Sequence, residues 1–596
     1  MNSAASRAPY EKQERVKLMV HSSLTEQGAG WARKWGWLLV TVPASIAFAQ
    51  TPASGDGTQE LLRQQERERL LRQQQETTPD IRLERPARAD AQSLPVQEDP
   101  CFRIDRIVLV GDSAADFQWA LKAADPEGDA ATGRCLGSEG INLTMKRVQN
   151  AIIERGYVTT RVLAASQDLT KGTLELTLIP GRIRTIRFTE DSSPRANRWN
   201  AVPAEPGDLL NLRDIEQSLE NFKRVPTADA DIQIMPTEGP DARPGDSDLV
   251  ITWKQEQPFR LNFSADDSGS KYTGKYQGSA TLAYDHWWTL NDLFYVSFNH
   301  DLGGGEPGSK GTRGYTVHYE VPYGYWLLGV TTNSYDYYQS VAGANQTYRY
   351  SGTSENSEVR LSRLLYRDAK RKTSAYVRAW LRSSTNAIDD TEIEVQRRRM
   401  AGWELGLAHR EFIGAATLDA NLAYRRGTGM LASLPAPEEA FDEGTARPSL
   451  LTADVQLAVP FALAGQRLRY TTAWRALWNR TPLVPQDRFS IGGRYTVRGF
   501  DGESTLIGDR GWLVRNDLGW ALGNSGQELY LGVDYGQVGG RSAAQLIGRR
   551  LAGAVIGLRG GYQRVSWDVF VGTPLSKPDG FQTGKTTAGF NLNWSF

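Results

Sequence analysis

Apolar and polar residues alternate along the chain from residue 257 to its end. The segment ATLDANLAY is typical, because Leu418 and Leu422 fall on one face of an extended strand while Asp419 and Asn421 fall on the other. Apolar side chains outside and polar ones inside are the pattern of a transmembrane β-barrel. The alternation therefore predicts a mainly β region over residues 257–596.

Eleven strand candidates lie between Arg260 and Trp478 and five more between Trp512 and Phe596, which gives sixteen. The number is even, as bacterial barrels require, and implies a lumen wide enough for water. The last candidate, TTAGFNLNWSF, puts four apolar residues on one face and ends on an aromatic one, as the last strands of outer-membrane barrels do. A soluble edge strand could show the same alternation.

Helical patterns occur only before the strand-rich region. Residues 59–76 are rich in good helix formers but polar around most of the circumference, so they suit a solvated leader or a water-filled lumen better than an apolar core. We assign 50–76 to this helix and the proline-rich 77–100 to an extended linker.

Two units with the order strand–helix–strand–strand follow, at 101–181 and 182–256. The first contains the strand FRIDRIVLV and a helix that we expect to be capped by Asn142 and ended by Gly156. In the second, the apolar stripe of the helix NLRDIEQSLENF contains Leu212, Ile215, Leu219 and Phe222. Tandem units of this kind look like a modular binding arm.

An export signal precedes all of these segments, at residues 1–49. Arg33 and Lys34 form a basic flank, 36–46 an apolar core, and Ala47-Phe48-Ala49 a cleavage site. Met1 and Met19 are both candidate starts, and the mature chain would begin near residue 50, outside the cytoplasm.

Charge and hydropathy narrow the range of protein classes further. Lys+Arg and Asp+Glu both number 69, so no net positive charge supports a nucleic-acid partner. The mean hydropathy is −0.47, and no run of about 18 apolar residues occurs, which excludes a helical membrane protein but not a barrel.

The chain has two cysteines, Cys101 and Cys135. In an exported protein an isolated pair this close in sequence predicts a disulfide rather than a metal site.

The longest connection between strand candidates spans residues 479–510 and contains FSIGGRYTVRGFDGE. This stretch shows no clean strand or helix period, and it places Arg498 between Val497 and Gly499.

Three segments resemble a known family. The loop motif Val497-Arg498-Gly499-Phe500 resembles the loop tip of the BamA-type superfamily. GYVTTRVLAASQDLTKGTLELTLIPGR resembles the first polypeptide-transport-associated (POTRA) domain of two-partner secretion transporters, the ShlB/FhaC/HecB haemolysin secretion/activation family. SGSKYTGKYQGSATLAYDHWWTLNDLFYVSFNHDL resembles that family's first barrel strands, so the resemblance covers nearly the whole chain.

The sequence departs from the family pattern in three places. Phe500 stands where many members have tyrosine, and Ala165-Ser166-Gln167 replaces the usual proline-containing stretch. The N-terminal extension has no counterpart that we can place.

The resemblance implies a 16-stranded transmembrane β-barrel, preceded by two periplasmic α/β POTRA domains and an N-terminal helix that plugs the lumen. It also implies that the loop folds inside the barrel and that Arg498 contacts Asp534. Strand alternation points the same way, because Leu531 and Val533 fall on the face opposite Asp534, and a carboxylate facing lipid would be costly. The alternative is a surface loop with a solvated arginine.

The implied function is a pore in the outer membrane of a Gram-negative bacterium. It would recognise a large unfolded exoprotein through its POTRA domains and move it to the cell surface by two-partner (type V) secretion. The partner would be a haemolysin, an adhesin or a contact-dependent toxin, which the pore could also activate. We expect a lipid-embedded monomer that is not an enzyme, with no catalytic residues, no cofactor, no metal, and no nucleotide or nucleic-acid partner; the phosphate-binding pattern GxxxxGK[ST] does not occur.

Three other functions compete with this one. An outer-membrane protein assembly insertase of the same superfamily would usually carry more than two POTRA units. A diffusion porin needs no periplasmic arm. A barrel hydrolase would need an activated nucleophile, whereas the histidines of the mature chain stand alone in the sequence: His286, His300, His318 and His409.

Overall fold

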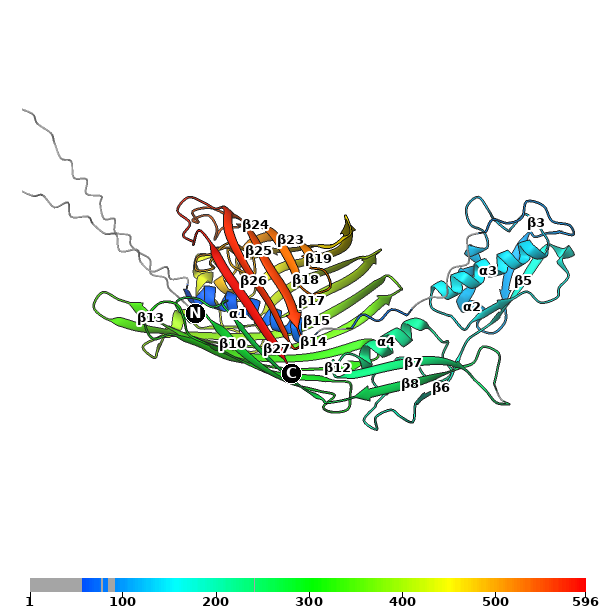
Figure 1. Ribbon diagram of the computed structural model, residues 1–596, viewed down its shortest axis with the longest axis horizontal. Helices are drawn as coiled ribbons and strands as arrows, with labels where there is room; N and C mark the ends of the chain where they lie inside the picture. The colour runs from blue at the N-terminus through cyan, green and yellow to red at the C-terminus, as the bar shows by residue number, and fades with distance from the viewer. Residues whose placement is uncertain (1–55, 77–78, 84–91, 241) are drawn as a thin grey trace, which may run out of the picture. The chain divides into compact units, whose positions relative to one another are not determined.

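The computed structural model describes residues 56–76, 79–83, 92–240 and 242–596. The predicted signal segment, 1–49, lies outside the described residues. The first described element is the 20-residue helix α1 (Asp56–Gln75), drawn in blue in Figure 1. Its leucines, arginines, glutamines and glutamates all favour a helix intrinsically.

The first small unit holds a three-stranded sheet of order β2-β5-β4, in which β5 is parallel to β2 and antiparallel to β4. A separate ladder joins β1 to β3, so the predicted strand FRIDRIVLV is divided at Ile104 and Asp105. The core lies between the α3 residues Val148 and Ile152 and the sheet. The elements are β1 (Phe102–Arg103), β2 (Arg106–Val110), α2 (Ala114–Phe117), η1 (Gln118–Ala123), β3 (Cys135–Leu136), α3 (Ser138–Glu154), β4 (Arg161–Leu163), η2 (Leu169–Lys171) and β5 (Thr173–Ile179).

Helix α3 begins more than a turn before the expected cap, so the prediction that Asn142 caps it is wrong. The helix starts at Ser138 after Gly137. The Glu98 carboxylate accepts hydrogen bonds from the backbone N–H groups of Gly137, Glu139 and Gly140 at 2.7 to 3.2 Å. A carboxylate distant in sequence therefore satisfies the first N–H groups of the helix, which a local capping rule cannot show.

The second small unit has the same arrangement of strands and helix. Its sheet has the order β6-β8-β7, with β6 (Ile183–Phe188), β7 (Ala228–Pro236) and β8 (Ser247–Gln255). Helix α4 (Leu212–Phe222) is capped by the Asn211 side chain, which accepts from the Arg213 N–H at 2.9 Å. The predicted apolar stripe packs onto the sheet around Trp253.

Sixteen long antiparallel strands form the closed barrel, and β27 pairs with β9 to complete it. The predicted division into eleven strands before the long connection and five after it is confirmed. A short β16 (Thr391–Glu392) extends the ladder of β15, and the turns η3 (Glu394–Gln396) and η4 (Pro437–Phe441) lie in connections. The strands are β9 (Phe259–Asp266), β10 (Gln277–Asp285), β11 (Leu293–Asp301), β12 (Gly311–Tyr323), β13 (Trp326–Ala342), β14 (Thr347–Arg367), β15 (Arg371–Ile388), β17 (Arg398–Ile413), β18 (Ala416–Thr428), β19 (Ser449–Leu463), β20 (Gln466–Asn479), β23 (Arg510–Ala521), β24 (Glu528–Gly539), β25 (Arg550–Tyr562), β26 (Val565–Ser576) and β27 (Thr587–Ser595).

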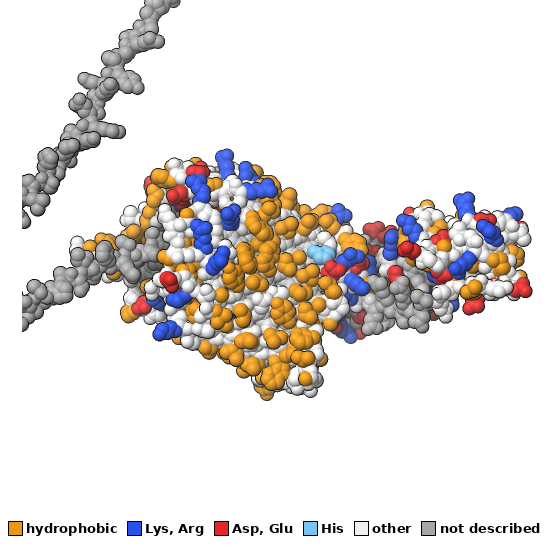
Figure 2. Space-filling model, turned by 90° about the horizontal axis from the view of Figure 1, so that it is seen from above, with side chains coloured by type: hydrophobic (Ala, Val, Ile, Leu, Met, Phe, Trp, Pro, Cys, Tyr) orange, Lys and Arg blue, Asp and Glu red, His pale blue; other side chains and the backbone are white. Residues whose placement is uncertain are grey.

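The outer face of the barrel is apolar, as Figure 2 shows by the orange side chains gathered over the strands. On β24, Leu531 and Val533 are 54% and 45% exposed. Asp534, which directly follows Val533, is 1% exposed. The same alternation exposes Leu592 and Trp594 on β27. Among the described helices, none combines the length and the apolar character needed to cross a membrane.

The long connection between β20 and β23 is ordered around a small hairpin. It contains η5 (Pro485–Asp487), β21 (Phe489–Ile491) and β22 (Leu506–Gly508), and Ser490 faces Ile507 across the pair. The stretch FSIGGRYTVRGFDGE shows no clean strand period, yet its first three residues form β21, since three residues are too few to show a period in sequence.

Candidate functional site

The loop motif lies between the two strands of this hairpin, where the backbone approaches the barrel wall. Gly499 has φ +91°, and a Cβ placed on it would lie 2.5 Å from the carbonyl oxygen of Thr573 in β26. Only glycine fits both the left-handed conformation and this contact. Val497 and Phe500 on either side are buried, and the Phe500 ring meets Phe581 edge-on at 5.8 Å.

Arg498 is directed at Asp534 on β24. Its Nε donates to Asp534 Oδ2 at 2.7 Å, and its Nη2 donates to Oδ1 at 2.8 Å. The backbone N–H of Arg498 also donates to Oδ2, at 3.0 Å. The two side chains are 4% and 1% exposed. The structure thus brings together, in a bidentate geometry, the arginine and the carboxylate that the family resemblance paired.

A second carboxylate, which the sequence analysis missed, completes this group. Arg498 Nη2 donates to Asp517 Oδ1 of β23 at 2.5 Å. Gly532 makes room for the contact, because a Cβ there would lie 2.7 Å from Arg498 Nη2. The alternation rule could have found Asp517, since its neighbour Leu518 faces outward and is 45% exposed.

Two more arginines lie beside these carboxylates. Arg515 Nε is 3.8 Å from Asp534 Oδ2, and Arg559 Nη1 is 3.5 Å from Asp517 Oδ2. The acids are therefore shared among several buried or half-buried cations. Loss of either acid would remove a partner from two of these cations, although Arg498 would keep the other acid and Arg559 would keep Glu528.

Helix α1 occupies the barrel through polar contacts. Glu60 is 1% exposed, and its carboxylate accepts from Arg63 and Arg67 of its own helix at 3.0 Å each. From the wall it accepts from Tyr335 Oη at 2.5 Å and from Thr273 Oγ1 at 2.9 Å. A buried glutamate is thus satisfied jointly by the helix and by the barrel.

Further contacts tie α1 to the wall and to the loop. Arg475 of β20 donates to both oxygens of Glu66, at 2.6 and 3.1 Å, and Arg72 pairs with Glu358 of β14. Arg63 Nη2 donates to the carbonyl oxygen of Gly502 at 2.7 Å, just beyond the loop motif. The helix and the loop therefore contact each other as well as the barrel, and a cavity of about 690 Å³ lies between them.

The linker and helix α4 meet the barrel at one group of charges. Glu220 and Glu216 of α4 accept from the backbone N–H groups of Ile81 and Leu83 at 3.1 and 3.0 Å. Arg367, at the end of β14, donates to both carboxylates at 2.9 Å and to the carbonyl oxygen of Ile81 at 2.6 Å.

The charge of Glu220 is stabilised in this junction. Burial by itself would raise the pKa of Glu220, but the hydrogen bonds and positive charges of Arg367 and Lys372 outweigh it, and the pKa is lowered. Lys372 Nζ donates to both oxygens of Glu220, at 2.8 and 2.9 Å. The linker that follows α1 is thus bound where the second small unit meets the barrel.

Cys101 and Cys135 are bonded to each other in the structure, across a separation of 34 residues. Cys101 directly precedes β1, and Cys135 begins β3, just before α3. The bond fixes the start of the first small unit to the segment that leads into its main helix.

Of the four histidines among the described residues, three make contacts of a structural kind or lie exposed. His286 packs on Trp253 at 4.8 Å, and its Nε2 is 2.8 Å from the carbonyl oxygen of Arg195. His409 Nδ1 is 2.9 Å from Thr373 Oγ1, and His300 is exposed. His318 differs from these three because it lies beside two carboxylates, those of Glu76 and Glu320.

Comparison with known protein families gives three matches. The family described as "Haemolysin secretion/activation protein ShlB/FhaC/HecB" matches residues 245–560. The ShlB-type POTRA domain matches residues 102–181, and a second POTRA domain matches residues 182–236.

Individual proteins match over most of the chain. Outer membrane transporter CdiB-2 of Burkholderia pseudomallei is 37% identical over 94% of this chain and 98% of its own length. Outer membrane transporter CdiB of Dickeya dadantii is 28% identical over 93% of this chain and 96% of its own. The solved structure of CdiB from Acinetobacter baumannii has a TM-score of 0.80 and 32% identity, and covers 91% of this chain and 99% of that one.

Proposed function

Because the chain belongs to the ShlB/FhaC/HecB family of haemolysin secretion/activation proteins, we propose that it exports an unfolded partner protein through its own barrel. The chain is an outer-membrane transporter of two-partner secretion, with its POTRA domains in the periplasm. Its relatives are transporters, and no catalytic step is part of the proposal.

One observation carries the proposal: α1 and the loop lie in the lumen, and polar contacts hold α1 there. Glu60 and Glu66 hold the helix, whereas Arg498 and an apolar cluster that contains Val497, Phe500 and Leu513 hold the loop. Water or a passing chain can replace the polar contacts of α1 one at a time, whereas release of the loop also exposes its apolar cluster. We therefore assign α1 the role of a plug and 479–510 that of a loop that folds back into the lumen.

We propose that residues 101–181 and 182–256 act as the two POTRA domains that capture the partner. Each contains a three-stranded sheet whose outer strands, such as β4 and β7, have a free edge within that sheet. An extended segment of the partner could pair with such an edge through backbone hydrogen bonds. The linker 77–100 would then carry the effect of capture to α1, through its contacts with Glu216 and Glu220.

The proposed transport uses no nucleotide. Folding of the partner outside the cell would make its passage irreversible, and the apolar outer face in Figure 2 would hold a single barrel in the lipid. Residues 257–596 would provide the whole pore, so a monomer suffices.

The test is to delete residues 56–75 and record single-channel conductance across a planar bilayer. If α1 is the plug, the deletion should raise conductance, whereas Glu60→Gln, which keeps the size of the side chain, should increase only the frequency of opening. Partner release into the medium is measured in parallel. Unchanged conductance in the deletion variant would contradict the plug, and normal secretion without the POTRA residues 101–256 would contradict capture.

A further inference from the structure

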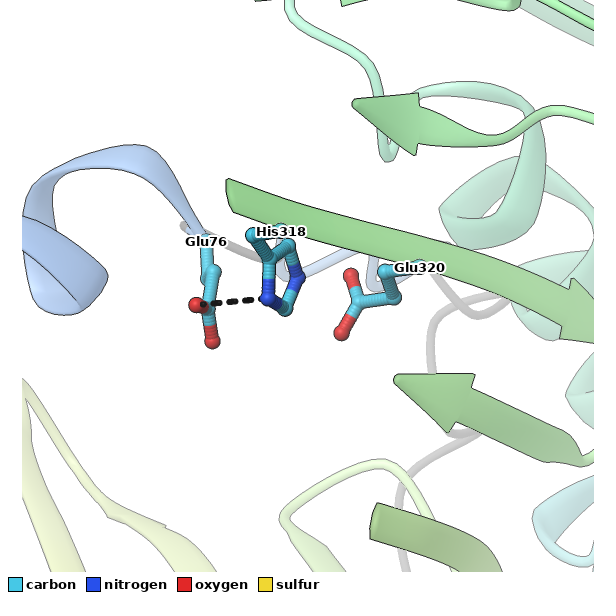
Figure 3. Close-up of side chains that lie close together, drawn as sticks. All are labelled: Glu76, His318 and Glu320. Atoms are coloured by element: carbon cyan, nitrogen blue, oxygen red, sulfur yellow. Dashed lines mark ion pairs between the residues drawn. The ribbon is translucent and has the colours of Figure 1, made fainter. Parts of the chain in front are cut away.

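Three potential metal ligands from two separate elements meet where α1 ends. Glu76 directly follows α1, and His318 and Glu320 lie on the inward face of β12. One ligand atom from each lies within 4.8 Å of the other two. Figure 3 shows the imidazole of His318 between the two carboxylates. The sequence predicts no metal site here, because Glu76 is remote in the chain from His318 and Glu320.

The imidazole is held in one orientation and keeps an unused nitrogen. His318 is 3% exposed, and its ring stacks on Tyr295 with centroids 4.9 Å apart. Its Nδ1 lies 2.9 Å from Thr331 Oγ1 and 3.5 Å from Glu76 Oε1. Among the described residues, its Nε2 has no hydrogen-bond partner although it is buried. A buried polar atom without a partner calls for an explanation, and a metal ion would supply one.

The carboxylates carry the supporting hydrogen bonds that metal ligands usually have. Tyr295 Oη donates to Glu76 Oε1 at 3.1 Å, and Arg224 Nη1 donates to Glu320 Oε1 at 2.5 Å. Such outer contacts orient a ligand and leave its other lone pairs for the metal. Gly329 of β13, which faces Glu320, leaves space beside the site, since a Cβ there would still be 3.7 Å from His318 Cε1 and 3.9 Å from Glu320 Oε2.

We propose that Glu76, His318 and Glu320 bind one divalent transition-metal ion, with zinc as the best fit, and that this ion fastens the end of α1 to the barrel wall. Imidazole nitrogen and carboxylate oxygen are both zinc ligands, and a site with three protein ligands leaves the fourth position for water. Ligands about 2.1 Å from a tetrahedral zinc lie roughly 3.4 Å apart, so small side-chain rotations would close the site. An effect of the ion on pore opening rests on the proposed role of α1 as the plug. The binding of the ion does not rest on it.

The binding test uses the full mature chain in detergent and ZnCl₂ alone, followed by calorimetry. The unaltered protein should bind one zinc, and His318→Ala and Glu76→Gln should each weaken binding by at least about tenfold. His409→Ala is the matched control, because that histidine also contacts a threonine hydroxyl in the barrel but is not part of the cluster. Both cysteines are in a disulfide, so no thiolate competes. No binding, or equal binding in all variants, would overturn the site.

The second test separates the site from its effect on the pore. In planar bilayers, ZnCl₂ should lower the opening frequency of the unaltered protein, and EDTA should restore it. The pore formed by His318→Ala should not respond to either reagent. Stoichiometric binding without a change in opening would refute the fastening of α1 and leave the site standing, while the deletion of residues 56–75 tests the plug independently.

Discussion

Arg498 is a buried cation between two carboxylates, and this environment decides how the loop responds to substitution. We expect Arg498→Ala and Asp534→Ala each to release the loop while the barrel still assembles. Breaking a buried pair on one side costs up to about 3–5 kcal/mol, and here the remaining partners, Asp517 for Arg498 and Arg515 for Asp534, offset part of this cost. Protease sensitivity of the loop and secretion yield measure the effect. Arg541→Ala is the control, since Arg541 and Asp442 are each 73% exposed and such a pair contributes ~0–1 kcal/mol.

A double-mutant cycle tests whether the two residues act on each other. If they do, the double variant should be less impaired than the sum of the single variants. Arg498→Lys keeps the charge but loses the planar fork that binds both oxygens, so it should restore secretion only in part. Strictly additive effects would show that the observed contact does not hold the loop.

A second prediction concerns Gly499, because the cost of its left-handed backbone can be separated from its close contact with β26. Gly499→Ala would combine the left-handed φ of +91° with a Cβ 2.5 Å from Thr573 O, and the loop should withdraw from the wall. Gly580 has φ +81° and nothing within 4 Å of its would-be Cβ, so Gly580→Ala carries only the conformational cost, about 1 kcal/mol. Crosslinking of cysteines placed on the loop and on β26 reports the distance. Equal crosslinking in both variants would show that the close approach does not position the loop.

Among the elements, the first small unit depends on its disulfide. Its closed loop spans 34 residues, so the chain-entropy model gives the bond about 4 kcal/mol of stability. Thiol labelling of the non-reduced chain should find no free cysteine. The variant with serine at both positions should exchange the backbone amides of β5 faster, while those of β8 in the second unit serve as the internal control. Quantitative labelling of both cysteines in the unaltered chain would contradict the bond.

Helix α1 shows how an element can be stable without an apolar face. Its charged side chains would suit neither a core nor lipid, but the barrel wall supplies partners such as Tyr335 for Glu60 and Arg475 for Glu66. The helix is therefore a good fit only inside a polar lumen.

At the scale of the whole molecule, Arg367 joins the barrel, helix α4 and the linker. Its side chain is 3% exposed, and those of its partners Glu216 and Glu220 are 1% and 4% exposed. Arg367→Ala should remove one cation from each of two buried carboxylates, which keep Arg213 and Lys372. It should increase exchange at the Ile81 and Leu83 amides and reduce secretion. Arg371→Ala is the control, because Arg371 pairs locally with Asp368 and is 48% exposed. Unchanged exchange would show that the junction does not hold the linker.

The same junction has an expected pH dependence. The folded pKa of Glu220 is lowered, so the stability that it contributes is present above the ordinary glutamate pKa of about 4.3 and is lost as pH falls through the lower folded value. Protection of the Ile81 amide should therefore be equal at pH 7 and pH 5.5 and should fall in stronger acid. Loss of protection already between pH 7 and pH 5.5 would contradict a lowered pKa of Glu220.

Much of the architecture could be predicted because the alternation of apolar and polar residues along a strand depends only on neighbours in the sequence. A period of two located the barrel strands, and the outward Leu531 and Val533 placed Asp534 inside. The same rule applied to β23 would have found Asp517. The start of α3 could not be found in this way, because Glu98, which holds its first turn, lies far from it in sequence.

By itself, the sequence determined the order of the modules, the number of barrel strands and the inward direction of Asp534, since these follow from periodicity and from the cost of a charge in lipid. Only the tertiary structure decided which distant charges meet: Arg498 with Asp517, Arg367 with Glu216 and Glu220, and Glu76 with His318. The physical reason is tertiary packing: barrel closure, the position of α1 in the lumen and the contact of α4 with the end of β14 bring together residues that are far apart in the chain. No local pattern records which side chains will meet there.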